Sequence, residues 1–206
     1  MTITWLGHAC FMLESGGYRL LVDPYRDVPG LRNTAAEAEA VYCSHGHGDH
    51  AYTQELTLTR GRTSPFTVEE IPTCHDEAGG SLRGGNTVRC FAAEGLRVVH
   101  LGDLGHQLSA QQLAAIGRCD ALMVPVGGTY TVDAAGAKAV ADAVGARVVI
   151  PMHYRRGAVG YGNIGTVEDF TALCAPELVR EYDGSALELT ADTPRQVAVL
   201  RPFSLL

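Results

Sequence analysis

The sequence has little positive charge, no long apolar run and no leader-like amino terminus. Sixteen lysine and arginine residues face 23 aspartate and glutamate residues, and the formal net charge is −7 at pH 7. Because nucleic-acid binding depends chiefly on cationic side chains that neutralise phosphates, this balance argues against a nucleic-acid partner. No stretch approaches the roughly 18 consecutive apolar residues of a membrane span, so we expect neither a membrane partner nor a signal peptide.

Closely spaced cysteine pairs are also missing. The six cysteines are scattered singly, without the spacing of a zinc ribbon or a redox dithiol. Most lie inside apolar runs, where a free thiol behaves as a small hydrophobic side chain. We therefore expect a cytoplasmic protein with free thiols at Cys10, Cys43, Cys74, Cys90, Cys119 and Cys174.

Length and composition favour one compact domain. The chain has 206 residues, of which 46% are hydrophobic and 19% charged, and this composition is not that of a disordered protein. The sequence shows no internal repeat, low-complexity tract or linker. A single domain over residues 1–206 is the expectation.

A short histidine-rich segment is the strongest signal in the chain. His45, His47, Asp49 and His50 fall within six residues and are separated by glycines. A neutral imidazole is the commonest metal ligand, and a neighbouring carboxylate adds a hard, charged oxygen. His45 and His47 point the same way on an extended segment, and Gly48 lets the chain turn before the other two. This pattern predicts a loop that contributes ligands to two ions.

Further imidazoles and carboxylates follow the predicted strands. In layered α/β proteins, sites form in the crevices outside the carboxyl ends of the strands, since the sheet is rigid and the next loop is free to vary. Side chains at several such ends therefore converge on one site. The four predicted strands are 18–22 before Asp23, 40–43 before His45, 96–101 before Asp103 and 148–152 before His153, and His75, after residues 70–74, joins the set.

The side of the strand on which a residue lies indicates whether it can reach the site. His100 falls on the opposite strand face from Asp103, so we expect it to be a hydrogen-bonded core residue and not a ligand. His106 lies in the loop after Asp103, where it either supports the site or lines its mouth.

Together these residues resemble the metal-binding signature of the metallo-β-lactamase-fold superfamily. The nearer resemblance is to its small cytosolic metal-dependent hydrolases, the group similar to ascorbate-phosphate lactonases. The segments that carry this likeness are 5–11, 74–77, 83–87, 100–106, 125–130 and 151–154.

The resemblance implies an α/β fold, a four-layer αββα sandwich, with two divalent metal ions at one edge. Zinc is the first expectation, with manganese or iron as alternatives. Asp103 would bridge the two ions, and Asp23 would orient the histidine loop through hydrogen bonds. The implied ligands are His45, His47 and His75 for one ion, and Asp49, His50 and His153 for the other.

The expected activity is hydrolysis of an ester, lactone, thioester or phosphodiester in a small soluble substrate. A metal-bridging hydroxide would attack, while Asp49 orients it and Asp103 holds both ions. An iron-dependent oxidoreductase similar to persulfide oxygenases is the alternative, although diiron relatives carry glutamate where this chain has His47. A metal-binding scaffold without turnover is a third hypothesis. The sequence leaves a homo-oligomer open.

Several residues near the expected site are candidates for substrate contact. His8 is either a core histidine or a substrate contact, and the resemblance brings it near the metals. Tyr130 follows two glycines and could donate a hydrogen bond to a developing oxyanion. Arg155 could grip a phosphate or carboxylate, or lie in a solvated loop. Arg83 and Asn86 bracket two glycines and predict a hairpin turn.

Three helices are predicted on the outside of the sandwich. Their starts carry capping residues, and glycines close the first two. The predicted helices run from Ser109 to Gly117, from Asp133 to Gly145, and from Thr166 to before Pro176.

Overall fold

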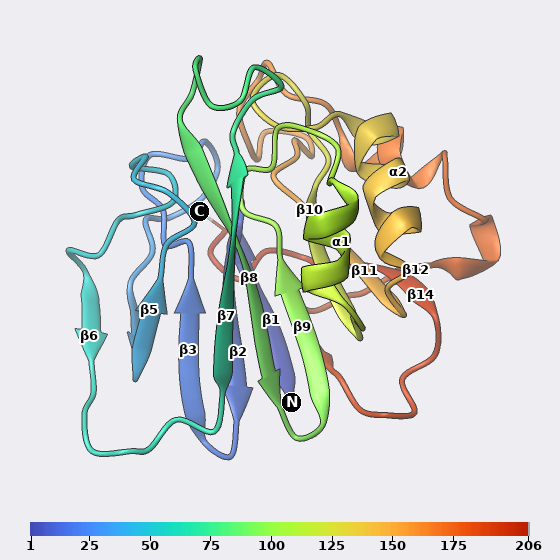
Figure 1. The fold of residues 1–206 in the computed structure, drawn as a ribbon. Helices are drawn as coiled ribbons and strands as arrows, with labels where there is room; N and C mark the ends of the chain where they lie inside the picture. Colours follow the sequence, from blue (N-terminus) through green and yellow to red (C-terminus); the bar gives the residue numbers. More distant parts are fainter. Residues whose placement is uncertain (206) are drawn as a thin grey trace.

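Two β-sheets packed face to face form the centre of the molecule in the computed structural model, which describes residues 1–205 (Figure 1). The five-stranded sheet has the order β13-β1-β2-β3-β5, and the seven-stranded sheet has the order β12-β14-β11-β10-β9-β8-β7. A separate two-stranded pair joins β4 (Ala36–Ala38) to β6 (Leu56–Leu58).

The five-stranded sheet combines the start of the chain with a late strand. β1, β2 and β3 follow one another in the chain and pair antiparallel, as short connections between neighbouring strands allow. β5 pairs in parallel with β3. β13 pairs with the free side of β1. The strands are β1 (Thr2–Gly7), β2 (Cys10–Ser15), β3 (Tyr18–Val22), β5 (Ala40–Tyr42) and β13 (Ala186–Glu188).

The seven-stranded sheet is antiparallel at one side and parallel from β9 to β12. His100, Met123 and Ile150 lie side by side on β9, β10 and β11. The strands are β7 (Thr67–Cys74), β8 (Gly85–Ala93), β9 (Leu96–His100), β10 (Ala121–Pro125), β11 (Val148–Met152), β12 (Val179–Glu181) and β14 (Gln196–Val199).

Alternation of side chains along the strands divides the hydrophobic residues into two clusters. Phe11 and Leu13 on β2 point into the main core between the sheets, whereas Cys10 belongs to a second cluster on the other face of the five-stranded sheet. His100 is buried in the main core, where it donates to the Ala9 carbonyl and accepts from the Gly102 N–H. The prediction for His100 is confirmed.

Three helices cover the outer face of the seven-stranded sheet (Figure 1). The capping residues act as predicted: Ser109 caps α1 (Ala110–Ile116), Asp133 caps α2 (Ala134–Val144) and Thr166 caps α3 (Val167–Thr171). α3 is shorter than predicted, because the chain tightens after Thr171 into bonds that reach back three residues. A 3₁₀ turn (Pro176–Leu178) follows.

The fourth layer differs from the expectation in one respect. Within residues 1–205 all α-helices lie after Ser109, so no helix covers the outer face of the five-stranded sheet. Tyr25, Val28 and Leu31, from the irregular segment after β3, fill that position. They bury the second hydrophobic cluster, and the α/β sandwich is complete without a helix on this side.

Strands of both sheets end at the same edge of the sandwich. β3 and β5 are parallel, β7 runs parallel to β9, and Figure 1 shows the arrowheads of β3 and β7 pointing to one end. The segments carrying the predicted ligands leave the strands at this edge. Among the described residues, no helix has the length and apolarity needed to cross a bilayer.

Candidate metal centre

The histidine-rich segment forms a tight loop after β5. The backbone N–H of His50 donates to the His47 carbonyl at 3.0 Å, which closes the turn. The His45 and His47 rings lie 4.6 Å apart between centroids, with His45 Nε2 3.0 Å from His47 Nδ1. The loop therefore presents adjacent imidazoles at its surface and buries His50 beneath them.

Asp23 anchors this loop from below. Its fully buried carboxylate accepts the Ser44 N–H and the Ser44 hydroxyl at 2.6 Å each, and His50 Nδ1–H at 2.8 Å. Burial alone raises the pKa of Asp23, but the hydrogen bond from His50 and the nearby imidazoles outweigh it and lower the pKa. The structure thus places Asp23 where the sequence predicts, orienting the loop as an anion.

Asp103 lies at the centre of the gathered side chains. Its Oδ1 is 3.1 Å from His50 Nε2, and its Oδ2 is 3.1 Å from His75 Nε2, 3.6 Å from His153 Nε2 and 3.9 Å from His45 Nε2. Each carboxylate oxygen therefore faces imidazole nitrogen. Burial by itself raises the pKa of Asp103, yet His153, His50 and His75 hold it well below its usual range.

These atoms fit divalent cations. His50 Nε2 and Asp103 Oδ1 are buried and 3.1 Å apart, but neither has a hydrogen-bond partner among the described residues. Burying a polar atom without a hydrogen-bond partner costs free energy. A cation bound between the nitrogen and the oxygen would remove that cost. Atoms within 4.8 Å of one another form three groups: His45, His47 and His75; His45, His50 and Asp103; and His8, Asp49, His50 and His153.

His75 is held in one tautomer. Its Nδ1–H donates to the Tyr130 carbonyl at 3.0 Å, which leaves the Nε2 lone pair facing Asp103. His106 supports the strand end just before it, because His106 Nε2 accepts the Cys74 N–H at 3.1 Å. The structure therefore places His106 behind the site, as a support for the β7 end.

His153 and His8 meet across the two sheets. The His153 N–H donates to the His8 carbonyl at 3.1 Å, and both residues have left-handed backbones, with φ of 53° and 52°. Such backbone strain in non-glycine residues is concentrated at functional sites. Burial and neighbouring imidazoles lower the pKa of His153 to about 3, although Asp103 opposes this shift.

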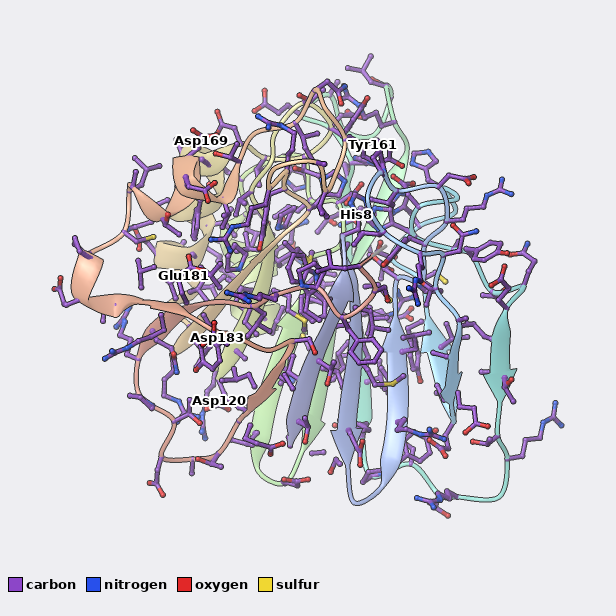
Figure 2. All side chains as sticks on the ribbon, turned by 180° about the vertical axis from the view of Figure 1, so that it is seen from behind. His8, Asp120, Tyr161, Asp169, Glu181 and Asp183 are labelled. Atoms are coloured by element: carbon purple, nitrogen blue, oxygen red, sulfur yellow. The ribbon has the colours of Figure 1, made fainter. Side chains whose placement is uncertain are left out.

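His8 is part of the site, not a histidine elsewhere in the core. Its ring centroid is 4.1 Å from that of His153, and its Nε2 is 3.5 Å from Asp49 Oδ2. The side chain is 2% exposed, and neither ring nitrogen has a hydrogen-bond partner within residues 1–205. Figure 2 shows His8 above the ends of the central strands, with Tyr161 close by. Their ring centroids are 5.5 Å apart.

Asn86 is a supporting residue that sequence reasoning missed. It lies in β8, beyond the predicted hairpin turn, and donates to the Leu101 carbonyl at 2.9 Å while accepting the Asp103 N–H at 2.9 Å. Gly102 makes this contact feasible, since a Cβ there would collide with Asn86 and Ser44. No local pattern marks Asn86, because its partners are 15 and 17 residues away.

A pocket of about 400 Å³ opens onto these ligands. Tyr130, Tyr161 and Arg83 form its wall, together with His47, Asp49, His75, Asp103 and His153. Of these wall residues, sequence reasoning named Tyr130 as a substrate contact; Tyr161 it missed, and Arg83 it interpreted as a turn residue.

Arg155 is not among the described residues that line this pocket. Its backbone N–H donates to the Gly165 carbonyl at 2.9 Å, and its charge is among the factors that lower the pKa of Asp169. The bonds from Thr166 are the larger cause of that shift. In Figure 2, Asp169 lies on α3, apart from His8 and Tyr161.

Residues 2–153 match the family described as the Beta-lactamase superfamily domain. The chain belongs to this family. Over 194 residues it is 31% identical to an Archaeoglobus fulgidus protein named a UPF0173 metal-dependent hydrolase, and the match covers 75% of this chain and 83% of that protein.

Solved structures agree with this assignment. A Thermotoga maritima protein described as a Zn-dependent hydrolase of the metallo-β-lactamase superfamily superposes with a TM-score of 0.76 at 36% identity, covering 97% of each chain. Igni18, a metallo hydrolase of Ignicoccus hospitalis, shares the fold with a TM-score of 0.67 at 19% identity, over 98% of this chain and 95% of the other.

The protein is therefore a metal-dependent hydrolase of the metallo-β-lactamase superfamily, and its histidine and aspartate clusters are suited to divalent metal. The narrower likeness to ascorbate-phosphate lactonases stays a prediction.

Proposed function

We propose that the protein hydrolyses an ester, lactone, thioester or phosphodiester bond of a small soluble substrate at the centre around Asp103. One observation carries the proposal. A single buried carboxylate faces His50 with one oxygen and His75, His153 and His45 with the other, at the floor of an open pocket. This arrangement suits a pair of cations that share one ligand.

The ligand assignment follows the grouping of the side chains. His45, His47 and His75 hold one divalent ion, with zinc as the first candidate and manganese or iron as alternatives. Asp49, His50 and His153, which group with His8, would hold the second, and Asp103 would contribute to both. When bound, the cations supply a water molecule ionised near neutral pH and polarise the oxygen of the scissile group.

Two carboxylates of the chain remain ionised for this chemistry. Burial raises the pKa of Asp49, but the imidazole of His8, 3.5 Å away, and the charge of His50 more than compensate, so the pKa is lowered. An ionised Asp49 accepts a hydrogen bond from the attacking water and orients it. The water adds to the carbonyl or phosphoryl centre, and the departing alcohol or thiol takes up a proton.

The pocket favours a small molecule as partner. Its volume of about 400 Å³ lies at the small end of ligand sites, and Tyr130 and Tyr161 narrow the approach. The net charge of −7 supports a partner other than nucleic acid. The six cysteines are free, which fits the reducing conditions of the cytoplasm, and this location forms part of the proposal.

Metal-loaded protein tests the proposal directly. The substrates are 4-nitrophenyl acetate, a lactone, a thioester and bis(4-nitrophenyl) phosphate, and bound metal is measured by elemental analysis. We expect turnover of at least one substrate class with zinc or manganese. Asp103→Asn should lose both metal and turnover, whereas Asp142→Asn, which changes an exposed helix carboxylate, should retain both.

Turnover that persists in metal-free protein would contradict the proposal. Stoichiometric iron accompanied by oxygen consumption would instead support an oxidoreductase. A fully loaded protein that hydrolyses none of the four substrate classes would favour a metal-binding scaffold.

A further inference from the structure

Arg83 lies in the turn between β7 and β8 and lines the metal pocket. It also lines a neighbouring cavity of about 630 Å³, which continues along Thr129, Val132 and Gly136. Tyr130 borders both spaces as well. Arg83 and Tyr130 therefore stand at the boundary between the metal ligands and an adjoining cavity that has room for the rest of a substrate.

The Arg83 guanidinium has no carboxylate partner among residues 1–205. Asp76, Glu77 and Asp133 line the neighbouring cavity with Arg83, but none forms an ion pair with it, and the two Asp76 oxygens accept backbone N–H groups of Ala78, Gly80, Leu82 and Arg83 at 2.8 to 3.1 Å. Eight other arginines form ion pairs: Arg19, Arg26, Arg89, Arg97, Arg118, Arg147, Arg156 and Arg201. Arg83 is thus a cation held beside the pocket without its own counter-charge.

The side chain is nevertheless held in place. Nη2 of Arg83 donates to the Thr129 carbonyl at 3.0 Å, and the guanidinium carbon lies 5.8 Å from the Tyr130 ring centroid. Asn163 fixes both supports, because it donates to the Tyr130 hydroxyl at 2.7 Å and its carbonyl accepts the Thr129 hydroxyl at 2.7 Å. A positioned guanidinium loses less conformational entropy when it binds a ligand.

Electrostatics explain what such a cation can bind. A guanidinium in the same pocket as ligands for two divalent cations is repelled by those cations unless an anion lies between them. The planar fork of arginine matches the paired oxygens of a carboxylate or phosphate. We propose that Arg83 binds an anionic oxyacid group, carboxylate or phosphate, on the substrate beside the bond that is cleaved. This inference rests on the proposed hydrolase function and names its substrate class.

Two pairs of substrates separate the role of charge from that of turnover. 4-Nitrophenyl hydrogen succinate and 4-nitrophenyl acetate share a leaving group and differ in a carboxylate. Methyl 4-nitrophenyl phosphate and dimethyl 4-nitrophenyl phosphate form the corresponding phosphate pair. We expect Arg83→Gln to raise KM for the anionic member of the processed pair about 10- to 100-fold, as loss of one charged hydrogen-bond donor predicts, and to leave the neutral member within about twofold.

Two further variants sharpen the result. Arg83→Lys keeps the positive charge but loses the paired donors of the guanidinium. It should raise KM for the anionic substrate less than Arg83→Gln does. Arg180→Gln removes an exposed arginine on β12 and should leave both substrates unchanged. Metal content and thermal stability should stay at wild-type values in all three variants. Calorimetry with succinate and with inorganic phosphate measures anion binding independently of turnover, and Arg83→Gln should weaken whichever anion the wild type binds.

Equal effects of Arg83→Gln on the charged and neutral substrates, together with unchanged anion binding, would overturn the inference and leave the hydrolase intact. Loss of anion binding in Arg83→Gln, in a metal-loaded protein that hydrolyses neither pair nor any of the four substrate classes, would overturn the hydrolase and support anion recognition by Arg83.

Discussion

Asp23 and His50 form a hydrogen bond of 2.8 Å between Oδ2 and Nδ1–H, and this bond decides which nitrogen of His50 faces the centre. With Nδ1–H donating to Asp23, Nε2 is the nitrogen that faces Asp103, 3.1 Å from its Oδ1. Ser44 extends the same control to His45, whose Nδ1 lies 3.0 Å from the Ser44 hydroxyl that donates to Asp23. One buried carboxylate therefore orients two ligands.

The first prediction concerns this bond. Asp23→Asn replaces an acceptor of three hydrogen bonds by an amide that cannot accept all of them, so His50 loses its fixed tautomer. We expect metal affinity to fall about 10- to 100-fold, measured by competition with a chromophoric chelator. Asp27→Asn, at an exposed carboxylate, is the control. Unchanged affinity in Asp23→Asn would show that the histidine loop holds its shape without this anchor.

The second prediction concerns Asn86. Asn86→Ala removes the acceptor of the Asp103 N–H and the donor to the Leu101 carbonyl, and leaves both groups buried. We expect the free energy of unfolding to fall by about 1 to 3 kcal/mol in urea denaturation. Gln111→Ala, at an exposed glutamine on α1, should change it by less than about 0.5 kcal/mol. Equal losses in the two variants would be inconsistent with a buried supporting role.

The third prediction concerns Gly105. A Cβ at this position would collide with the backbone of His75 and Asp76, so Gly105→Ala should push the β7 end away from Asp103. We expect a loss of about 1 to 3 kcal/mol in unfolding free energy and weaker metal binding. Gly184 is a matched control, because an added Cβ there meets nothing within 4 Å and, like Gly105, it is not among the glycines with positive φ. Gly184→Ala should leave both stability and metal affinity unchanged.

The fourth prediction concerns acid stability. Burial raises the pKa of Asp120, but the Arg97 N–H and the Arg118 and Arg147 guanidinium groups outweigh it, so the folded-state pKa is lowered. A lowered folded pKa means that the stabilisation is present above the unfolded value near about 3.9 and is lost as pH falls below it. Wild type should therefore be more stable than Asp120→Asn at pH 7, and the difference should shrink below about pH 4.

Chemical denaturation at a series of pH values measures this difference. A gap between the two proteins that stayed constant from pH 7 to pH 3 would contradict the charge-based account of Asp120.

Much of the site could be predicted because its signals are local. The closely spaced histidines stand out in the sequence, and the ends of β3, β9 and β11 show in the apolar runs that precede Asp23, Asp103 and His153. Helix starts were predictable for the same reason, since the side chains of Ser109, Asp133 and Thr166 cap the backbone three residues ahead. Hydrogen bonds between residues close in the chain can be predicted from the residue types at neighbouring positions.

Other features depend on residues that are distant in the chain. His8 follows β1 and Asp49 follows β5, and the fold brings their side chains within 3.5 Å although β2 and β3 lie between these strands in the sheet. Arg83 and Arg155 are both arginines next to site residues in sequence, yet the fold turns the first toward the pocket and places the second near α3. The outer layer over the five-stranded sheet likewise depends on where Tyr25 and Leu31 pack.

By itself, the sequence determined which side chains can bind metal and at which strand ends they lie. Hydrophobic periodicity and the turn residues that end a strand are patterns of only a few neighbouring residues. Only the tertiary structure decided which oxygen of Asp103 faces which imidazole, that Asn86 supports Asp103, and that Arg83 is the cation at the pocket. These relationships join separate strands and loops, and the packing of the two sheets sets their distances.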